Sequence, residues 1–303
     1  MPPIRQVEIF LGQSLLHSAE EGQHNFLNLV SNVLSEGGMQ PVYRHIDDAY
    51  DCNTRHSLIH MKAPVSESGL VFRRTYHYPF WQIERTEKRG DWDVAHAAFD
   101  PASIDGAQAN KFARFWRNRL FPETTQSDGD HIYVPLQGKL MQRRSFQSAS
   151  PIEMLESVLA ASSDPVVAAL HPKETYEPAE IDALEKLAAK YANLEVVTGE
   201  MLRYLPNCKL VVTQNSSVAF NGYFFRKPTI LFADIDFHHI AVTLKRQPFA
   251  QAMDQALANT PDYEKYLWWF WQDQSINAGR SEAQDKIHAR LTRFGWPLAG
   301  RSE

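Results

Sequence analysis

The sequence predicts an α/β protein built from two domains, each with a largely parallel sheet. Three observations lead to this fold class. The chain has 303 residues, which is enough for two domains of ordinary size. Short apolar runs alternate with segments of helical periodicity, as strands and helices do in α/β folds. A polar, glycine-containing stretch at residues 122–130 (PETTQSDGD) interrupts this alternation and is the best candidate for a linker.

The part of the chain before that stretch opens as strand, helix, strand. Residues 6–11 (QVEIFL) form the first apolar run, and residues 22–34 carry apolar side chains at the spacing of one helix face. Gly37 and Gly38 are expected to end that helix. Further strands are expected at residues 41–46, 57–61 and 70–73, and a helix at residues 107–120.

The part after the stretch is more regular. Ser150-Pro151-Ile152-Glu153 has the pattern of a capping box with proline at the first helical position, which predicts a helix to about residue 161. Two later helices are expected to start at Thr260 and Ser281. The remaining strands are expected at residues 131–136, 166–170, 194–197, 210–213 and 229–232, and the remaining helices at residues 178–191, 201–205 and 216–225. This order is typical of a doubly wound α/β domain.

These elements divide the chain into three expected parts. Residues 1–125 form an N-terminal α/β domain, and residues 130–260 form a C-terminal Rossmann-like domain. Residues 261–303 are helices that we expect to pack back on the N-terminal domain. Two Rossmann-like domains that face each other across a cleft make the GT-B arrangement of glycosyltransferases, in which the second domain holds the nucleotide.

Composition excludes several classes of function. The net charge is −5, so nothing favours non-specific binding to nucleic acid. Two cysteines, Cys52 and Cys208, are too few for a disulfide framework or a zinc site, and they fit a reducing cytoplasm. The first ten residues have no secretory signal, and no apolar stretch approaches the ~20 residues that span a bilayer. We therefore expect a cytoplasmic protein.

Two short polar motifs follow predicted strands that we expect to be neighbours in the sheet, and they suggest a binding site for a nucleotide-sugar. His171-Pro172-Lys173 comes directly after the apolar run 166–170, and Asn215-Ser216-Ser217 comes after the run 210–213. Ligands bind at the carboxyl ends of the strands in an open parallel sheet, and a helix start offers free N–H groups to a phosphate. A plainer interpretation is a strand-ending turn at His171 and a helix N-cap at Asn215 or Ser216. Capping and phosphate binding are compatible, because both use the same helix start.

Further polar residues are candidates for contacts with the sugar. Asp234-Ile235-Asp236 looks like the Asp-x-Asp that holds a divalent metal in another glycosyltransferase fold, but we expect no metal here. Instead, Asp234, Asp236 and His238 are expected to line the cleft and to touch ribose or sugar. In the first domain, Glu67 is a candidate for the base or nucleophile that glycosyl transfer needs. Arg73 and His77 are candidates for binding an anionic sugar carboxylate.

Taken together, residues 130–245 resemble the capsule-polysaccharide biosynthesis family, which includes bacterial Kdo transferases. The resemblance lies in Val134-Pro135-Leu136-Gln137, in Leu170-His171-Pro172, and in Thr213 to Ser217 followed by Lys227-Pro228-Thr229. It implies a GT-B fold and a CMP-activated acidic sugar as donor. It also implies that Gln137, His171, Ser216 and Ser217 lie at the donor, with the last three as phosphate contacts. The nucleotide-sugar would be a substrate, and neither a cofactor nor a metal is implied.

Two departures from the family pattern keep other functions open. Residues 138–144 (GKLMQRR) are basic where the family often has acidic residues, and Glu67-Ser68-Gly69 lacks one carboxylate of the family's Glu-Asp-Gly. We expect a glycosyltransferase that acts on a glycan or glycolipid acceptor, with peripheral association at the inner face of the membrane left open. The alternatives are a transferase or epimerase that uses a UDP-sugar, a homologue that binds a nucleotide or glycan without catalysis, and a structural role in polysaccharide export.

Overall fold

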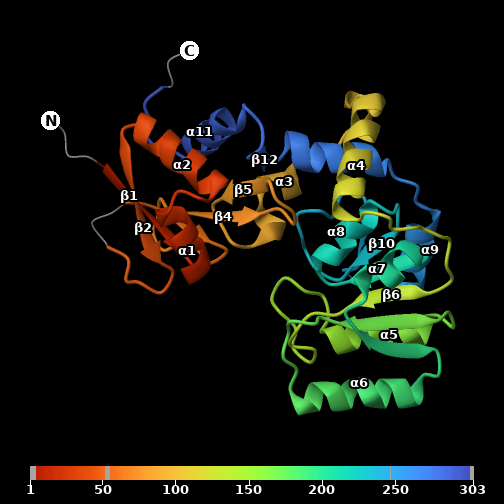
Figure 1. The fold of residues 1–303 in the computed structure, drawn as a ribbon. Coiled ribbons are helices and arrows are strands. Elements are labelled where there is room, and N and C mark those ends of the chain that lie inside the picture. The colour runs from red at the N-terminus through yellow and green to blue at the C-terminus, as the bar shows by residue number, and fades with distance from the viewer. Residues whose placement is uncertain (1–4, 52–54, 246, 301–303) are drawn as a thin grey trace. The chain divides into compact units, whose positions relative to one another are not determined.

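The computed structural model describes residues 5–51, 55–245 and 247–300, so Cys52 lies outside the described residues. The chain forms two compact units (Figure 1). The first unit consists of Met1–His96 together with Phe270–Glu303, and the second consists of Ala97–Trp269. In the part of the chain that the structure describes, no helix is both long enough and apolar enough to cross a membrane.

The division between the units falls earlier than the stretch 122–130 that the sequence suggested as a linker. Helix α4 (Gly106–Leu120) belongs to the second unit, where it packs against α10 (Tyr263–Trp268). The stretch itself is anchored to the same unit, because Gln126 Nε2 donates to the carbonyl of Phe225 at 2.9 Å. An added Cβ at Gly129 would lie 1.7 Å from a backbone oxygen, so only glycine fits there. The expected domains 1–125 and 130–260 therefore differ from the observed units.

The first unit contains a six-stranded sheet in the order β12-β5-β4-β3-β1-β2. Strands β2, β1, β3 and β4 are parallel to one another, whereas β5 pairs antiparallel with β4 and β12 pairs antiparallel with β5. The parallel sheet that the sequence predicted is thus confirmed for four strands. The strands are β1 (Arg5–Leu11), β2 (Met39–His45), β3 (His56–His60), β4 (Leu70–Arg74), β5 (Phe80–Glu84) and β12 (Ile276–Asn277).

Alternation along β1 explains how this sheet is covered. Val7, Ile9 and Leu11 point to one face and join the main core, because side chains alternate along a strand. That core includes residues of helices α1 (Gln13–Glu20), α2 (Asn25–Glu36) and α11 (Ala283–Arg293), and α2 packs directly on α11. The opposite face has a smaller cluster around Phe10, against which loop residues pack. Short helical turns lie at Arg89–Asp91 and in α3 (Asp93–His96).

The second unit contains a sheet of six parallel strands in the order β11-β10-β9-β6-β7-β8. The chain starts at β6, moves outward to β7 and β8, and then returns to the other side of β6 for β9, β10 and β11. This is the strand order of the Rossmann fold, and it places the topological switch point between β6 and β9. The Rossmann-like prediction is confirmed. The strands are β6 (Ile132–Pro135), β7 (Val166–Leu170), β8 (Leu194–Thr198), β9 (Leu210–Thr213), β10 (Thr229–Leu231) and β11 (Val242–Thr243).

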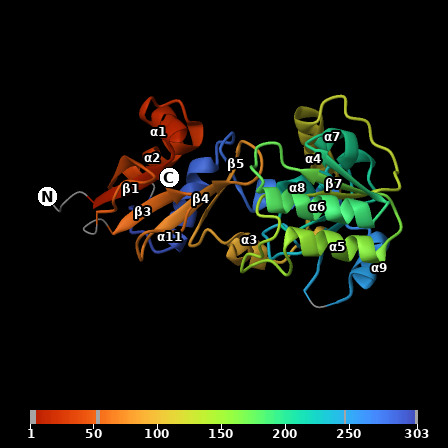
Figure 2. The same cartoon turned by 90° about the horizontal axis from the view of Figure 1, so that it is seen from below.

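Helices cover both faces of this sheet. One core cluster joins α5 (Pro151–Ala161), α6 (Pro178–Lys190) and α9 (Phe249–Ala258) to the same face, and Figures 1 and 2 show α5 and α6 side by side. The capping box predicted at the start of α5 is present, because Ser150 N–H donates to Glu153 at 2.7 Å and Glu153 N–H donates back to Ser150 Oγ. The two remaining helices are α7 (Met201–Tyr204) and α8 (Ser217–Tyr223).

Candidate functional site

The candidate site lies at the carboxyl edge of the second sheet. Gln137, His171 and Asn215 follow strands β6, β7 and β9. The order of the strands places β6 between the other two, so the His171 and Asn215 motifs are not on neighbouring strands, although their sequence pattern had suggested that they were. Strands in a sheet lie about 4.8 Å apart, so the ends of β7 and β9 are separated by roughly 10 Å. Gln137 lies at the strand end between them.

A hydrogen bond joins the ends of β6 and β9 at the switch point, and an unpartnered polar atom follows β6. Thr213 Oγ1 donates to the carbonyl of Pro135 at 3.0 Å, which ties the ends of the two strands together. Two residues after Pro135, the side-chain oxygen Oε1 of Gln137 is buried and has no hydrogen-bond partner among the described residues. Buried polar atoms in native proteins nearly always have a partner. This oxygen is therefore a candidate acceptor for a donor group on a ligand.

The loop after β6 approaches the His171 loop closely. An added Cβ at Gly138 would lie 2.5 Å from the carboxylate of Glu174, so a larger residue there would have to displace that side chain. His171 is exposed, and its turn is fixed by two bonds: its N–H donates to Tyr176 Oη at 2.8 Å, and its Nδ1 accepts from Lys173 N–H at 3.2 Å. Because Nδ1 is an acceptor, the neutral ring carries its proton on Nε2. Nε2–H is thus the group that can donate to an anion.

A buried amide cluster positions the Asn215-Ser216-Ser217 segment. Gln147 Nε2 donates to Gln214 Oε1 at 3.0 Å and to Asn215 Oδ1 at 3.4 Å. The other end of the Gln147 amide accepts from the N–H of Arg144 at 2.8 Å, so the loop after β6 is tied to the end of β9. Three side-chain amides are thereby held in the interior at the carboxyl edge, directly before the start of α8.

Ser216 and Ser217 occupy different positions at the start of α8. Ser216 is buried and caps the helix, because its Oγ accepts from the N–H of Val218 at 3.3 Å. Ser217 is exposed at the first helical position. Since α8 has only seven residues, its dipole contributes little, and any phosphate contact would rest on the hydroxyl and N–H groups themselves. The N-cap interpretation is therefore observed, and Ser217 is the serine that a ligand can reach.

The segment Asp234 to His238 does not present its polar residues on one surface. Asp234 is exposed and forms an ion pair with Lys245 at 2.9 Å. Asp236 is fully buried, which argues against its expected contact with ribose or sugar. His238 is half-buried and donates from Nδ1 to the carbonyl of Ile235 at 2.7 Å.

The buried Asp236 lies close enough to Tyr223 to affect the pKa of its hydroxyl. Burial raises the pKa of Tyr223 well above its ordinary value, with smaller contributions from Tyr263 and from the Asp236 charge. Among the described residues, no group of three or more His, Cys, Asp or Glu side chains is arranged to hold a metal ion. A cavity of about 130 Å³ adjoins Asp234 and the Gln147 loop, which is below the roughly 300 Å³ at which ligand pockets usually begin.

In the first unit, Glu67 lies at the edge of the sheet opposite to the carboxyl ends. It is exposed in the turn before β4, and β4 runs parallel to β3 and β1. The turn is held by Trp296, whose Nε1–H donates to the carbonyl of Ser68 at 3.0 Å. In open α/β sheets ligands bind at the carboxyl ends, so the position of Glu67 argues against its expected role as a base.

Arg73 and His77 do lie at the carboxyl end of β4. Arg73 is the penultimate residue of that strand, and His77 is in the turn to β5, where its ring contacts Trp271 at 5.7 Å between centroids. Two histidines that were not predicted from the sequence complete this cluster. His60 ends β3, and His24 caps α2 by accepting from the N–H of Leu27 at 3.3 Å.

The pKa values of these histidines are set mainly by burial, and the nearby arginines add positive charge. Burial lowers the pKa of His60 to about 4, and the charges of Arg73, His24 and Arg74 act in the same direction. Burial also lowers the pKa of His24, with a contribution from Arg74. The charges of Arg73 and Arg74 are the part of this environment that favours a bound anion. The sequence could have indicated this cluster, because basic residues stand at the ends of both predicted strands.

Basic side chains also follow β6. Lys139, Arg143 and Arg144 are exposed in the loop that the Gln147 cluster fixes at the carboxyl edge. In the sequence these residues appeared only as a departure from the family pattern. Their place in the fold puts positive charge beside the candidate site, where an anionic ligand would be attracted.

The fold is shared with a known protein. The structure of KpsC from Thermosulfurimonas dismutans, described as a β-Kdo 2,7-transferase, matches with a TM-score of 0.51 and 10% sequence identity, over 87% of this chain and 89% of that chain. This match confirms the GT-B-like fold that the resemblance implied, with two α/β units on parallel sheets.

Other solved structures match with lower scores. A UDP-GlcNAc 2-epimerase from Neisseria meningitidis has a TM-score of 0.37 at 11% identity, over 95% of this chain and all of that one (100%). The S. aureus MnaA–UDP structure has a TM-score of 0.38 at 10% identity, over 96% of each chain. Scores below 0.5 add nothing to the assignment. No protein-family model matches the sequence, and no curated protein matches it.

Proposed function

We propose that the chain is a metal-independent GT-B glycosyltransferase of capsule or surface polysaccharide synthesis. It transfers a CMP-activated, Kdo-like acidic sugar to a glycan or glycolipid acceptor. The observation that carries the proposal is the set of polar groups at the carboxyl edge of a Rossmann-ordered sheet, above all the buried and unpartnered Oε1 of Gln137 at the switch point. The shared fold with KpsC, a Kdo transferase, supports the choice of reaction.

The residues at this edge suit the parts of a nucleotide-sugar. His171 Nε2–H, the Lys173 ammonium and the exposed start of α8 at Ser217 are donors for a phosphate. The ends of β7 and β9 lie roughly 10 Å apart, a distance that a nucleoside monophosphate joined to a sugar spans. Gln137 Oε1 is an acceptor, and the amino group of cytosine is a donor, whereas uracil has a carbonyl there. This chemistry favours CMP over UDP-sugars.

The basic cluster of the first unit suits an acidic sugar or acceptor. Arg73 and Arg74 offer guanidinium groups, and a carboxylate accepts two parallel bonds from such a group. The base that activates the acceptor hydroxyl has no supported assignment, because Glu67 lies at the amino edge of its sheet. This observation favours a second candidate function, a homologue that binds the nucleotide-sugar without transferring it.

Calorimetric titration of CMP into the full chain tests the donor site. We expect binding with affinity reduced by roughly ten- to a hundredfold in His171→Ala and Ser217→Ala, because each removes a hydrogen bond to a charged group worth about 1.5–3 kcal/mol. Ser157→Ala, on α5, is the matched control and should bind as the wild type does. Absence of CMP binding at millimolar ligand would contradict the proposal, and preference for UMP would support the UDP-sugar alternative.

Hydrolysis of CMP-Kdo separates the two candidate functions. Release of free sugar by the wild type, lost in His171→Ala, supports an active transferase. Binding of CMP without hydrolysis or transfer, under conditions in which a known transferase is active, supports the non-catalytic homologue.

A further inference from the structure

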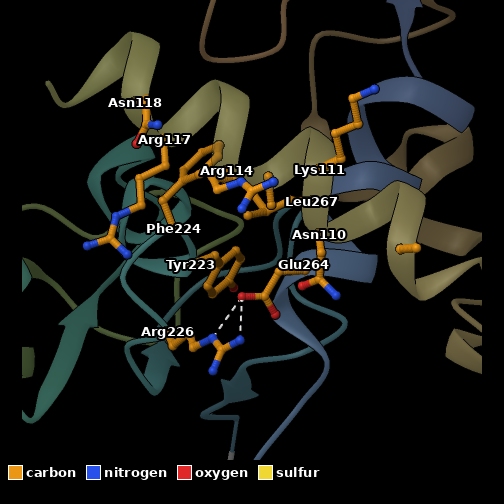
Figure 3. Close-up of a pocket in the computed structure, with 12 residues that line it drawn as sticks. Asn110, Lys111, Arg114, Arg117, Asn118, Tyr223, Phe224, Arg226, Glu264 and Leu267 are labelled. Atoms are coloured by element: carbon orange, nitrogen blue, oxygen red, sulfur yellow. Dashed lines mark hydrogen bonds and ion pairs between the residues drawn. The ribbon is translucent and has the colours of Figure 1, made fainter.

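A second pocket in the Ala97–Trp269 unit lies away from the candidate donor site. Its volume is about 760 Å³, and it is lined by one side of α4, the C-terminal end of α8 and α10 (Figure 3). Helix α8 starts at the carboxyl edge with Ser217 and ends at Tyr223, and the pocket adjoins this far end. Ligand pockets have volumes of roughly 300–1,000 Å³, so this one has the size for a small molecule.

The walls of the pocket are strongly basic. Four cationic residues line it, and Glu264 is the single carboxylate among the lining residues. Three of the cations, Lys111, Arg114 and Arg117, are spaced three residues apart on α4 and therefore project from one side of that helix. Within the described parts of the chain, none of these three forms an ion pair. The fourth cation is Arg226, just after α8.

The one carboxylate is already engaged. Arg226 Nε and Nη2 both reach Glu264 Oε1 at 2.7 Å, as the dashed lines in Figure 3 show. This pair fixes Arg226 at the pocket and leaves the positive charge of α4 uncompensated. The Arg117 guanidinium lies 5.1 Å over the ring of Phe225, a contact that holds the side chain in place without neutralising it.

The shape and polarity of the pocket indicate what it can hold. In Figure 3, Arg114 and Arg117 extend from α4 on either side of Phe224, and Lys111 points away from them. Phe224 and Tyr223 are buried and supply apolar ring surface. Guanidinium groups present a planar fork that matches phosphate oxygens, and like charges in a concave surface concentrate a positive potential. Asn110 and Asn118 line the pocket as well, and their amides can bond to hydroxyl groups.

We propose that this pocket binds a phosphate-bearing, sugar-sized ligand, with the phosphate held by the arginines of α4 that line it. The same chemistry is available from a soluble sugar phosphate and from the phosphate head group of a lipid. The site does not depend on the donor site, because it lies at the other end of α8 and shares no residue with it.

Calorimetry and vesicle flotation of the full chain test the site and its source. The soluble probes are glucose 1-phosphate and inorganic pyrophosphate, and the vesicles contain phosphatidylglycerol or, as a control, phosphatidylcholine alone. We expect R114Q/R117Q to weaken binding at least tenfold. Arg119→Gln makes the same kind of charge change on the same helix, outside the pocket, and should stay within twofold of the wild type.

The outcomes decide the proposal in either direction. Binding of a soluble probe that the double variant loses supports a sugar phosphate, and binding only to phosphatidylglycerol vesicles with the same loss supports a lipid head group. Equal binding by wild type and double variant, no binding to any probe, or binding lost in Ser217→Ala but kept in the double variant overturns the proposal. If the loss of the Arg117–Phe225 contact impairs folding, Arg114→Gln alone gives the test, with at least a threefold loss expected.

Discussion

His60, at the end of β3, provides a direct test of the basic cluster in the first unit. Its ring lies 5.1 Å from that of Phe72, and its pKa is about 4 because of burial and the charges of Arg73, His24 and Arg74. In the unfolded chain this pKa returns to 6.5. Between these values the unfolded chain binds the proton more readily than the folded protein, so stability falls as the pH decreases. The contribution is fully present above pH 6.5 and is lost towards pH 4.

The magnitude follows from the difference between the folded and unfolded pKa values of His60. A tenfold change in proton affinity corresponds to about 1.36 kcal/mol, so the wild type should lose on the order of 3 kcal/mol relative to His60→Leu between pH 7 and pH 4. Urea unfolding of both proteins at pH 4, 5, 6 and 7 measures this difference. An NMR titration of the His60 ring gives its pKa directly, and an anion bound by Arg73 and Arg74 should raise it. A His60 pKa near 6.5, or a difference in unfolding free energy that stays constant with pH, would refute the reasoning.

Four further variants or treatments test other parts of the structure. Gln147→Ala should lower the unfolding free energy by about 2–3 kcal/mol and weaken CMP binding, because it leaves buried amide groups without partners; unchanged values in both assays would argue against the amide cluster. Gly129→Ala should destabilise the second unit in thermal unfolding, because its Cβ would overlap a backbone oxygen. Burial raises the pKa of Glu84 to about 7, although Arg290 lies 3.0 Å away. The unfolding free energy of the wild type should therefore fall by on the order of 3 kcal/mol relative to Glu84→Gln as the pH rises from 4.5 to 7. Burial raises the pKa of the Cys208 thiol to about 12, so iodoacetamide at pH 8 should modify it only after unfolding, as mass spectrometry can show.

The regular part of the chain was predictable because each element carries a strong local signal. The strand at residues 210–213 and the capping box at Ser150 were predicted at their observed positions. Helix α9 and strand β5 were not predicted. β5 (FWQIE) is buried at every position, including Gln82 and Glu84, so its polar residues hide the pattern of a core strand. Its pairing with β4 is antiparallel, which the predicted parallel sheet did not include.

The candidate site shows where sequence reasoning stops. Residues at the ends of predicted strands were identified correctly as lying at one edge, since the fold determines that edge. The order of strands, and hence the place of β6 between β7 and β9, depends on long-range pairing that no local pattern reveals. Asp236 lies in the core, which cannot be read from its residue type. Glu67 precedes β4, as the predicted strand at residues 70–73 already implied. The basic wall of α4 was not predicted, because basic residues on the polar side of a helix are usually only solvated.

A crystal structure of the full chain with CMP tests the central claim most directly. We predict a phosphate within hydrogen-bonding distance of His171 Nε2 and of the start of α8 at Ser217, with Gln137 facing the base or ribose. A nucleotide bound at another edge of the sheet, or one whose phosphate touches neither His171 nor Ser217, would contradict the claim.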